Sequence, residues 1–171
     1  MSRTLYRLLS LVFAAAPCMA VSLQASGEGI AGFTADDTIT IRSAEARMDE
    51  QVDIIHFAGG FEIRANDFYL SSEQASLYGK LDDPETIEVT GSPAVIRLGT
   101  TNQGRPTTIS GEATRIVYQR DTDSIRMEGQ ASLSRDGYTM RGGEIEYEIA
   151  TDQLSAGGAG GVRIEVQPHN P

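Results

Sequence analysis

The sequence has 171 residues, carries a net charge of −10 at pH 7 and contains a single lysine, Lys80. Nucleic-acid binding depends on basic contacts to phosphate, and an anionic membrane surface repels an acidic protein, so we expect neither kind of partner. The absence of tryptophan and the small aromatic content leave little surface for stacking on sugars.

The first residues, 1–20, have the form of a secretory signal peptide, with cleavage expected between residues 20 and 25. Arg3 and Arg7 precede an uncharged apolar run that ends in small residues. This run is shorter than the roughly 20 residues of a spanning helix, so an uncleaved membrane anchor is the less favoured alternative. Cys18, the only cysteine, would leave with the leader, and the remaining chain would have no disulfide and no thiolate metal site.

The chain after the leader, about 150 residues, has the size of one domain. Residues 21–37 are rich in Gly, Ser and Ala without periodicity, which predicts a flexible lead-in. Thr38–Arg42 alternates and is β-branched, which predicts a strand. Ser43–Met48 aligns with Ser110–Tyr118, and the glycine and β-branched pair of the second copy favour strand over helix for both.

One pattern, apolar residues at alternate positions followed by glycine, recurs along the chain. The four copies are Ile55–Gly59, Ile87–Gly91, Ile125–Gly129 and Leu154–Gly158. Alternation at period two gives a strand one dry and one wet face. Asp-containing turns precede three of the copies, so each unit is predicted to be a hairpin. Glycine normally weakens a strand, so its return at one register predicts a bulge or a tight bend.

The alternation is predicted to continue beyond each glycine and to define one inward-facing row. Its members are Ile55, Phe57, Phe61, Ile63, Val89, Val95, Ile116, Tyr118, Ile125, Met127, Leu133, Met140, Ile145 and Tyr147. In the fourth copy the same alternation places Gly160 and Val162 inward. The simplest interpretation of the row is a hydrophobic core, in which each full burial stabilises the fold by about 1.5–3 kcal/mol. Lys80–Glu85 is predicted to be an extended loop centred on Pro84, and Arg97–Pro106 an exposed loop.

No stretch after the leader has a convincing 3.6-residue period, whereas short strands and turns alternate throughout. This pattern predicts a single all-β domain over residues 38–166, followed by a tail at 167–171. Roughly twelve or more antiparallel strands must close or fold over into a barrel, a sandwich or a jelly roll. The uneven spacing of the repeated glycines argues against a regular solenoid.

The leader, the alternating first strand and the repeated hairpin together resemble the LptA/OstA-like family of periplasmic lipopolysaccharide-transport proteins of Gram-negative bacteria. The segments that carry the resemblance are Thr38–Ala46, Ile55–Gly59, Ser110–Ala113 and Ile125–Leu133. The resemblance implies a twisted, partly open antiparallel β-jelly roll, built from repeated hairpins, whose apolar inward row contacts the acyl chains of lipid A. The glycine cluster at Gly157–Gly161 departs from the family pattern.

The resemblance also implies where the protein works and with what. It implies a periplasmic location, partners among the inner-membrane and outer-membrane components of the lipopolysaccharide transport machinery, and end-to-end stacking of rolls. Passage of lipopolysaccharide from the inner to the outer membrane is the function it implies. An inner-membrane-anchored relative of the same fold is the nearest alternative.

The residues themselves are compatible with carriage of a lipid. Acyl chains need only apolar walls, and the flexible side chains of Met127 and Met140 can repack around different chains. Arg64 and Arg141 are candidates for head-group contacts at the mouth of a cleft. The edge formed by Ile39, Thr40 and Ile41 has no charge or proline to protect it, so it pairs either with a partner strand or within its own sheet.

Signals for catalysis are weak. His56 and His169 lie far apart, and the acidic turn at Asp121 and Asp123 lacks the other ligands of an EF-hand. The glycines at 157–161 lack the Lys-Ser/Thr pair of a phosphate loop. We therefore expect no enzyme activity, no cofactor and no metal site. A secreted polysaccharide-active enzyme is the alternative from a different class.

Overall fold

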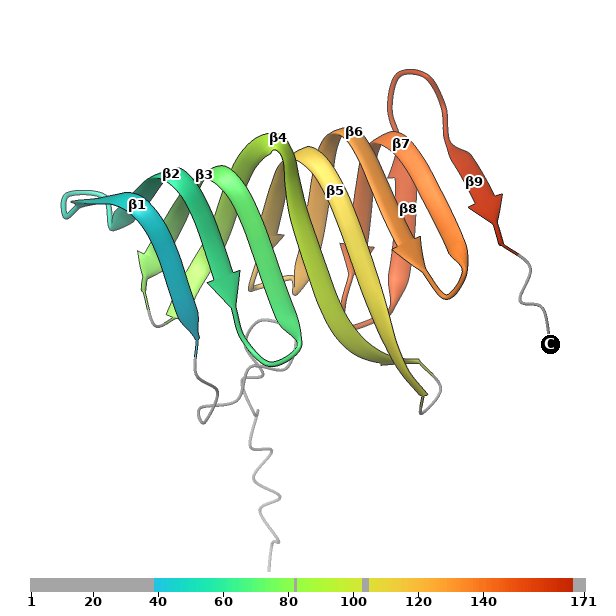
Figure 1. The fold of residues 1–171 in the computed structure, drawn as a ribbon, viewed down its shortest axis with the longest axis horizontal. Helices are drawn as coiled ribbons and strands as arrows, with labels where there is room; N and C mark the ends of the chain where they lie inside the picture. Colours follow the sequence, from blue (N-terminus) through green and yellow to red (C-terminus); the bar gives the residue numbers. More distant parts are fainter. Residues whose placement is uncertain (1–38, 82, 103–104, 168–171) are drawn as a thin grey trace, which may run out of the picture.

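The computed structural model describes residues 39–81, 83–102 and 105–167. The predicted leader and lead-in lie outside these residues, as does the predicted tail apart from Gln167. The described chain forms nine strands in one antiparallel sheet (Figure 1). They are β1 (Thr40–Asp49), β2 (Ile54–Arg64), β3 (Phe68–Lys80), β4 (Asp83–Asn102), β5 (Arg105–Gln119), β6 (Ser124–Arg135), β7 (Tyr138–Glu148), β8 (Gln153–Gly157) and β9 (Arg163–Val166). The strands from β1 to β8 are neighbours in chain order, and β9 pairs with β7.

The predicted fold class, an all-β antiparallel roll, is confirmed, but the strands are fewer and longer than predicted. β4 alone has 20 residues. The loop predicted at Arg97–Pro106 is mostly strand, with Thr100 paired to Thr107. The strands β3 and β4 extend into the loop predicted at Lys80–Glu85, where Gly79 pairs with Pro84 and Lys80 with Asp83. Both predictions were wrong because a neighbouring strand supplies ladder partners to segments that look like loops on their own. Within the described segments no helix has the length and apolarity that a membrane span requires.

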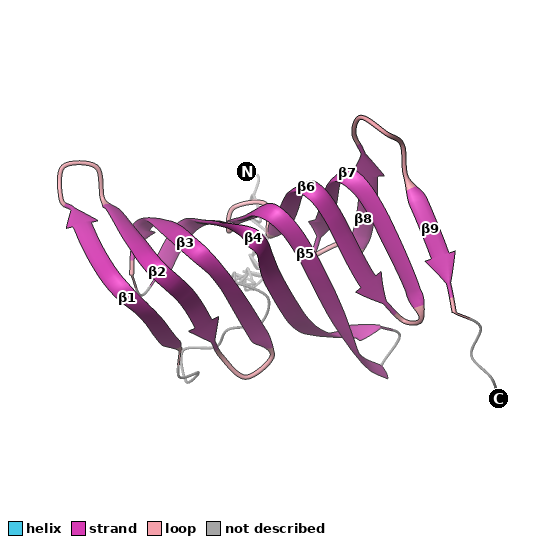
Figure 2. Cartoon of the chain, turned by 45° about the horizontal axis from the view of Figure 1, so that its top comes forward, coloured by secondary structure: helices cyan, strands magenta, loops and turns pink. Residues whose placement is uncertain are grey.

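The long strands bend near their middle, so the sheet folds over on itself into a roll with two walls (Figures 1 and 2). The turns at residues 65–67 and 136–137 lie at the end of the first wall, and we call them the first lip. The turns at 50–53, 120–123 and 149–152 lie at the end of the second wall, and we call them the second lip. The two walls are joined along the bends, and the lips face each other across the open side.

The bends coincide with the repeated glycines, as the sequence predicts. The register shifts there by one bulge in each ladder, between Ala58/Phe61, Thr90/Ala94 and Glu128/Ala131. Gly59 and Gly60 have φ values of 77° and 88°, and Gly129 has a φ of 78°. This left-handed backbone is costly for residues with a Cβ atom. It also accounts for Gly60, for which the repeat offers no counterpart: nothing surrounds its Cβ position, so its role is conformational.

The assignment of Val95 to the inward row was wrong. The corner of β4 contains three residues, 91–93, between Thr90 and Ala94, whereas the corners of β2 and β6 contain two. Because side chains alternate along a strand, one extra residue reverses the face of everything that follows. Ala94 and Ile96 are therefore buried, and Val95 lies half-buried on the opposite face, paired with Glu112.

The fourth copy of the repeat breaks where the others only bend. β8 ends at Gly157 and pairs with one half of β7, and β9 pairs with the other half. Between them the chain leaves the sheet through Gly158, Gly160 and Gly161, all with positive φ. The predicted inward alternation through Val162 is therefore wrong, and that side chain is exposed. The glycine cluster is an enlarged corner that lets two short strands cover the edge of β7.

Candidate functional site

The apolar interior of the roll is the candidate site, and most of the predicted inward row lies in it. The buried members are Ile55, Phe57, Phe61, Ile63, Val89, Ile116, Tyr118, Ile125, Met127, Leu133, Ile145 and Tyr147. Met140 is half-buried and packs against this core, whereas Val95 does not belong to it. The structure adds buried residues that were not in the predicted inward row, which are Phe68, Leu70, Ala75, Leu77, Ile87, Ala94, Ile96, Leu98, Ile109, Ala113 and Ala131. On β3 the buried positions change from Phe68 and Leu70 to Ala75 and Leu77 across the bend, so simple alternation along the strand misses one half of them. The extra corner residue of β4 likewise hides the buried residues that follow it.

The middle of the interior is filled by side chains from both walls. Met127 of the second wall packs against Gly111 of the first wall. A Cβ atom built on Gly111 would lie only 2.5 Å from the Sδ atom of Met127. On β2 the rings of Phe57 and Phe61 lie 5.0 Å apart across the bend. An apolar ligand therefore enters the middle of the roll only if the walls move apart.

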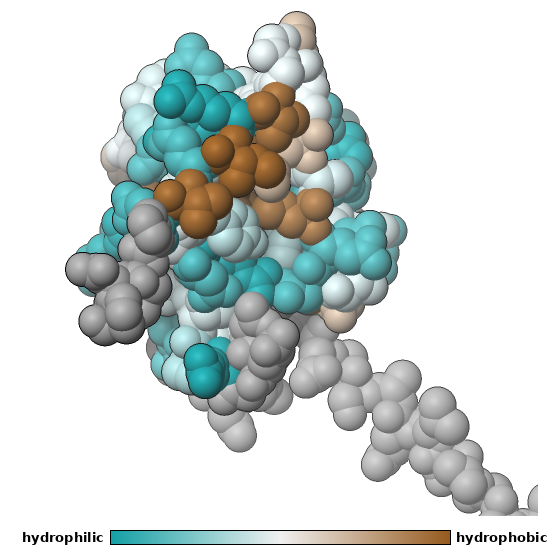
Figure 3. All heavy atoms as spheres, turned by 90° about the vertical axis from the view of Figure 1, so that its right-hand side faces the viewer, coloured by the Kyte–Doolittle hydropathy of each residue, from teal (hydrophilic) through white to brown (hydrophobic). Residues whose placement is uncertain are grey.

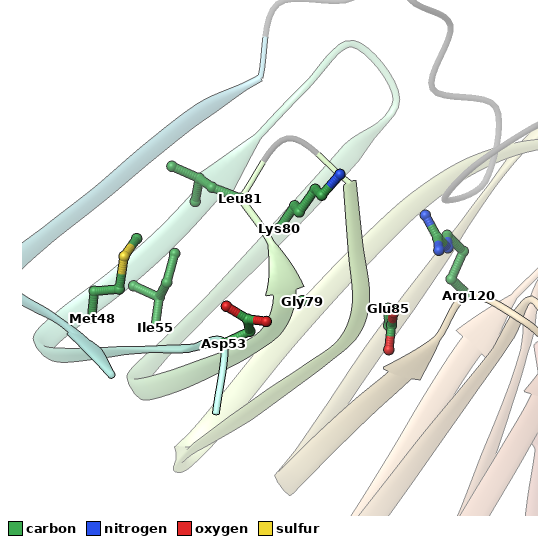
Figure 4. A pocket seen from close by; sticks show the side chains of 8 residues that line it. All are labelled: Met48, Asp53, Ile55, Gly79, Lys80, Leu81, Glu85 and Arg120. Atoms are coloured by element: carbon green, nitrogen blue, oxygen red, sulfur yellow. The ribbon is translucent and has the colours of Figure 1, made fainter. Parts of the chain in front are cut away.

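The interior reaches the surface beside β1. Met48 is paired with the buried Ile55, yet its own side chain is 60% exposed. The groove next to it encloses about 510 Å³ and is also lined by Leu81, Lys80 and Arg120 (Figure 4). Asp53 and Glu85 also line it, so two acidic groups stand beside the two basic ones, and Met48, Ile55 and Leu81 provide the apolar part of the lining.

The interior also reaches the surface at the opposite end of the sheet. Ile164 of β9 is paired with Met140, and Ile164 and Val166 are 57% and 72% exposed. Figure 3 views this end and shows apolar side chains gathered on it. The inward row thus continues from one exposed end of the sheet to the other.

The outer face carries several ion pairs. Arg115 lies between Glu88 and Glu128, at 2.8 and 2.6 Å. The hydrogen bond from Arg115 holds the pKa of Glu88 below its ordinary value. Arg126 forms a similar pair with Glu146. This contrast between faces fixes the register, because a slip of one residue would bury these charges.

The two arginines considered for head-group contacts lie on the outer face. Arg64 is paired with Glu62 at 2.8 Å, and Arg141 is paired with Glu165 at 2.7 Å. In each pair the arginine hydrogen bond lowers the pKa of the glutamate. Their position gives no support to contacts at the mouth of the interior.

β1 is the edge of the sheet in the part of the chain that the structure describes. It pairs only with β2 there. Ile39, just before β1, is 42% exposed, whereas Ile41 packs against the core. The predicted partner edge at Ile39, Thr40 and Ile41 therefore lies on an edge strand, and nothing in the structure tests its partner.

The structure describes one of the two histidines. His56 lies on the exposed outer face, with Nδ1 2.9 Å from the hydroxyl of Ser76. His169 lies outside the described residues. Among the described side chains, no three of His, Cys, Asp or Glu are close enough together to hold a metal ion.

The described chain is thus an all-β antiparallel roll with an apolar interior and ion pairs on its outer face. Residues 40–153 match the family model described as LptA/(LptD N-terminal domain) LPS transport protein. This match spans most of the chain, and the protein belongs to that family of lipopolysaccharide transport proteins, which confirms the resemblance seen in the sequence.

The fold agrees with a solved structure. The crystal structure of LptH, the LptA-homologous periplasmic component of the lipopolysaccharide transport device of Pseudomonas aeruginosa, superposes with a TM-score of 0.66 at 17% sequence identity. The similarity covers 77% of this chain and 96% of that one. At this identity the comparison shows that the two share the jelly-roll fold. Comparison with curated proteins gives no match.

Proposed function

We propose that this protein carries lipopolysaccharide through the periplasm from the inner toward the outer membrane, with the acyl chains of lipid A sheltered against the inward row. The main observation in support is that the apolar interior reaches the surface at both ends of the sheet, next to Met48 and next to Ile164. Membership of a lipopolysaccharide transport family supports the same ligand.

The physical basis is transfer of acyl chains from water to apolar walls, worth about 0.8 kcal/mol for each buried methylene group. The walls pack against each other in this structure, so part of that gain offsets the free energy needed to separate them. In the described residues the strand ladders connect the two walls only through the bends, so the walls can separate without breaking the ladders. A carrier needs such moderate net affinity, because it must pass its cargo on.

Site-specific photo-crosslinking tests the proposal. A crosslinking residue at Met48 or Ile164 replaces an exposed side chain of the inward row, so it should not disturb folding and should capture lipopolysaccharide. Arg47 and Arg163, the exposed neighbours on the other face, are the matched controls. Equal labelling of the two faces would contradict a lipid path along the interior.

The same experiment extends to the middle of the roll. Crosslinkers at Phe57 and Met127 face the interior, and those at Glu88 and Arg126 face outward. Capture at Phe57 and Met127, in variants shown to fold by circular dichroism, requires that the walls separate around the lipid. Capture at the two ends alone would restrict the lipid site to the mouths.

Partners are proposed to contact the two ends of the sheet. We infer end-to-end association of copies, and docking to the membrane components of the transport machinery, through the edge at Ile39, Thr40 and Ile41. Replacing Ile39 and Ile41 by Asp should abolish oligomers measured by light scattering over a range of concentrations. Oligomers that persist unchanged would place the contact elsewhere.

The periplasmic location is proposed from the predicted leader and from the family. Mass spectrometry of periplasmic material should find a mature protein that begins between residues 20 and 25. A protein that keeps residues 1–20 and fractionates with the inner membrane would instead be the anchored relative.

A further inference from the structure

One buried cation joins the two lips of the roll. The Arg135 side chain, at the end of β6, is only 6% exposed, and its Nη2 donates to Oδ2 of Asp152 at 2.9 Å while Nη1 donates to Oδ1. Its Nε also donates to Asp136 at 3.2 Å. Such a bidentate, charge-assisted contact is among the strongest polar interactions in proteins.

The two partners come from opposite ends of one strand. Arg135 is paired with Tyr138, the first residue of β7. Asp152 lies in the turn that follows Glu148, the last residue of β7. β7 has 11 residues, and at full extension about 33 Å would separate its ends. They meet only because β7 folds over with the rest of the sheet (Figure 1). The pair therefore crosses the open side of the roll, from the first lip to the second.

Further hydrogen bonds secure both sides of this crossing. On the second lip, the Tyr147 hydroxyl donates to Oδ1 of Asp152 at 2.9 Å. On the first lip, the Thr107 hydroxyl donates to Asp136. The two carboxylates thus tie β5, β6 and β7 to one guanidinium.

The opposite end of the roll is built differently. In the first hairpin, Met48 and Asp53 occupy the places that Tyr147 and Asp152 take in the third. Methionine has no hydroxyl to donate, and the Met48 side chain is exposed. The β1–β2 end of the roll therefore lacks the tyrosine hydroxyl that holds the carboxylate in place at the β6–β8 end.

We propose that Arg135 and Asp152 form a clasp that holds the lips together at the β6–β8 end of the roll and must open for an amphiphile to pass. This extension to lipid passage rests on the proposed function. Acyl chains inside the roll are joined to a head outside it through the gap between the lips. The Arg135–Asp152 contact crosses this gap and would block the head from moving along the gap.

The chemistry of the clasp indicates what opens it. The guanidinium of Arg135 is covered, whereas the Asp152 side chain is 47% exposed, so the carboxylate is the partner that can be replaced. A phosphate group on the lipid head offers a guanidinium the same bidentate geometry as a carboxylate. An anionic head can therefore take the place of Asp152 and release the second lip as it arrives.

The clasp is tested first without lipid. Spin labels at Thr108 and Gln153, exposed positions beside the first and second lips, report the gap by double electron–electron resonance in a Cys18→Ser background. Asp152→Asn should shift this distance to longer values and broaden it. Labels at Thr40 and Asp49, at the two ends of β1, are the matched control and should not respond.

Two further variants guard against a folding defect. The exchange Arg135→Asp with Asp152→Arg should restore the short distance in part, and Arg135→Met fills the site without the charge and should open the gap. A distance that is the same in wild type, Asp152→Asn and Arg135→Met would overturn the clasp.

The second arm adds lipid A. Lipid A with its phosphates should lengthen the Thr108–Gln153 distance in the wild type, and dephosphorylated lipid A should do so less. If phosphorylated lipid A crosslinks at Met48 but leaves the distance unchanged, opening of the clasp by lipid is wrong and the proposed carrier function stands. If nothing crosslinks at Met48 or Ile164, the carrier function fails, while the lipid-free distances still decide the clasp.

Discussion

The Sδ atom of Met127 lies where a side chain on Gly111 would begin, 2.5 Å from the ideal Cβ position. The two residues belong to opposite walls, so this contact sets how closely the walls approach. The Cγ2 atom of Ile96 lies 2.9 Å from the same ideal Cβ position on Gly111. The absence of a side chain at Gly111 is what allows the interior to close.

Gly111→Ala should therefore destabilise the fold by about 1–3 kcal/mol through overpacking, and Met127→Ala should cost about 2–5 kcal/mol by leaving a cavity. The double variant should cost clearly less than the sum, because the new methyl group occupies part of the space that the methionine leaves. Urea unfolding of the four proteins measures the coupling. Additive costs would show that the walls do not touch at this point.

The corners offer a test of conformational strain. Gly129→Ala places a Cβ atom at a φ of 78° and 2.8 Å from the Thr114 hydroxyl, and should cost about 1–3 kcal/mol. Gly60→Ala has a similar φ but open space around it, so its cost should be smaller. Gly157→Ala has neither problem and should be close to neutral. Thermal unfolding that ranks the three differently would contradict this account of the bends.

The clasp should make stability depend on acid pH. Hydrogen bonding to Arg135 holds the pKa of Asp152 below its ordinary value of 3.8. The folded state therefore favours the carboxylate, and this stabilisation is present above about pH 4 and is lost as the pH falls through the lowered pKa. The difference in melting temperature between wild type and Asp152→Asn should be widest near pH 6 and should close toward pH 2. A difference that is constant with pH would argue against the ion pair.

The phenol of Tyr147 should lose its proton at a higher pH than an ordinary tyrosine. Burial, and then its hydrogen bond to Asp152, raise the pKa of its phenol to about 12. The folded state favours the protonated phenol, so its contribution is complete below the ordinary value of 10.0 and is lost as the pH rises through about 12. The absorbance at 295 nm should show a late step in the wild type, with circular dichroism reporting folding, and Tyr147→Phe should lack it. Complete titration of the folded protein near pH 10 would contradict the burial of this hydroxyl.

Much of the candidate site follows from alternation because alternation holds within each half of a strand and passes unchanged through the corners of β2 and β6. Phe57 and Phe61 are four positions apart, an even number, so the row passes through the corner of β2 on the same face. Val89 and Ala94 are five apart, and there the prediction failed. Repeated glycines locate a bend, but they do not reveal how many residues the bend takes up.

By itself, the sequence determined the all-β class, the dry face of most half-strands, most of the turns and the glycine bends, because each depends on residues only a few positions apart. The tertiary structure alone decided which walls touch and where the lips close. Arg135 and Asp152 are 17 residues apart, and their contact depends on the sum of the bend and twist along β7 and its neighbours. No local pattern encodes that sum, since side chains meet across the roll only after the whole sheet has folded over.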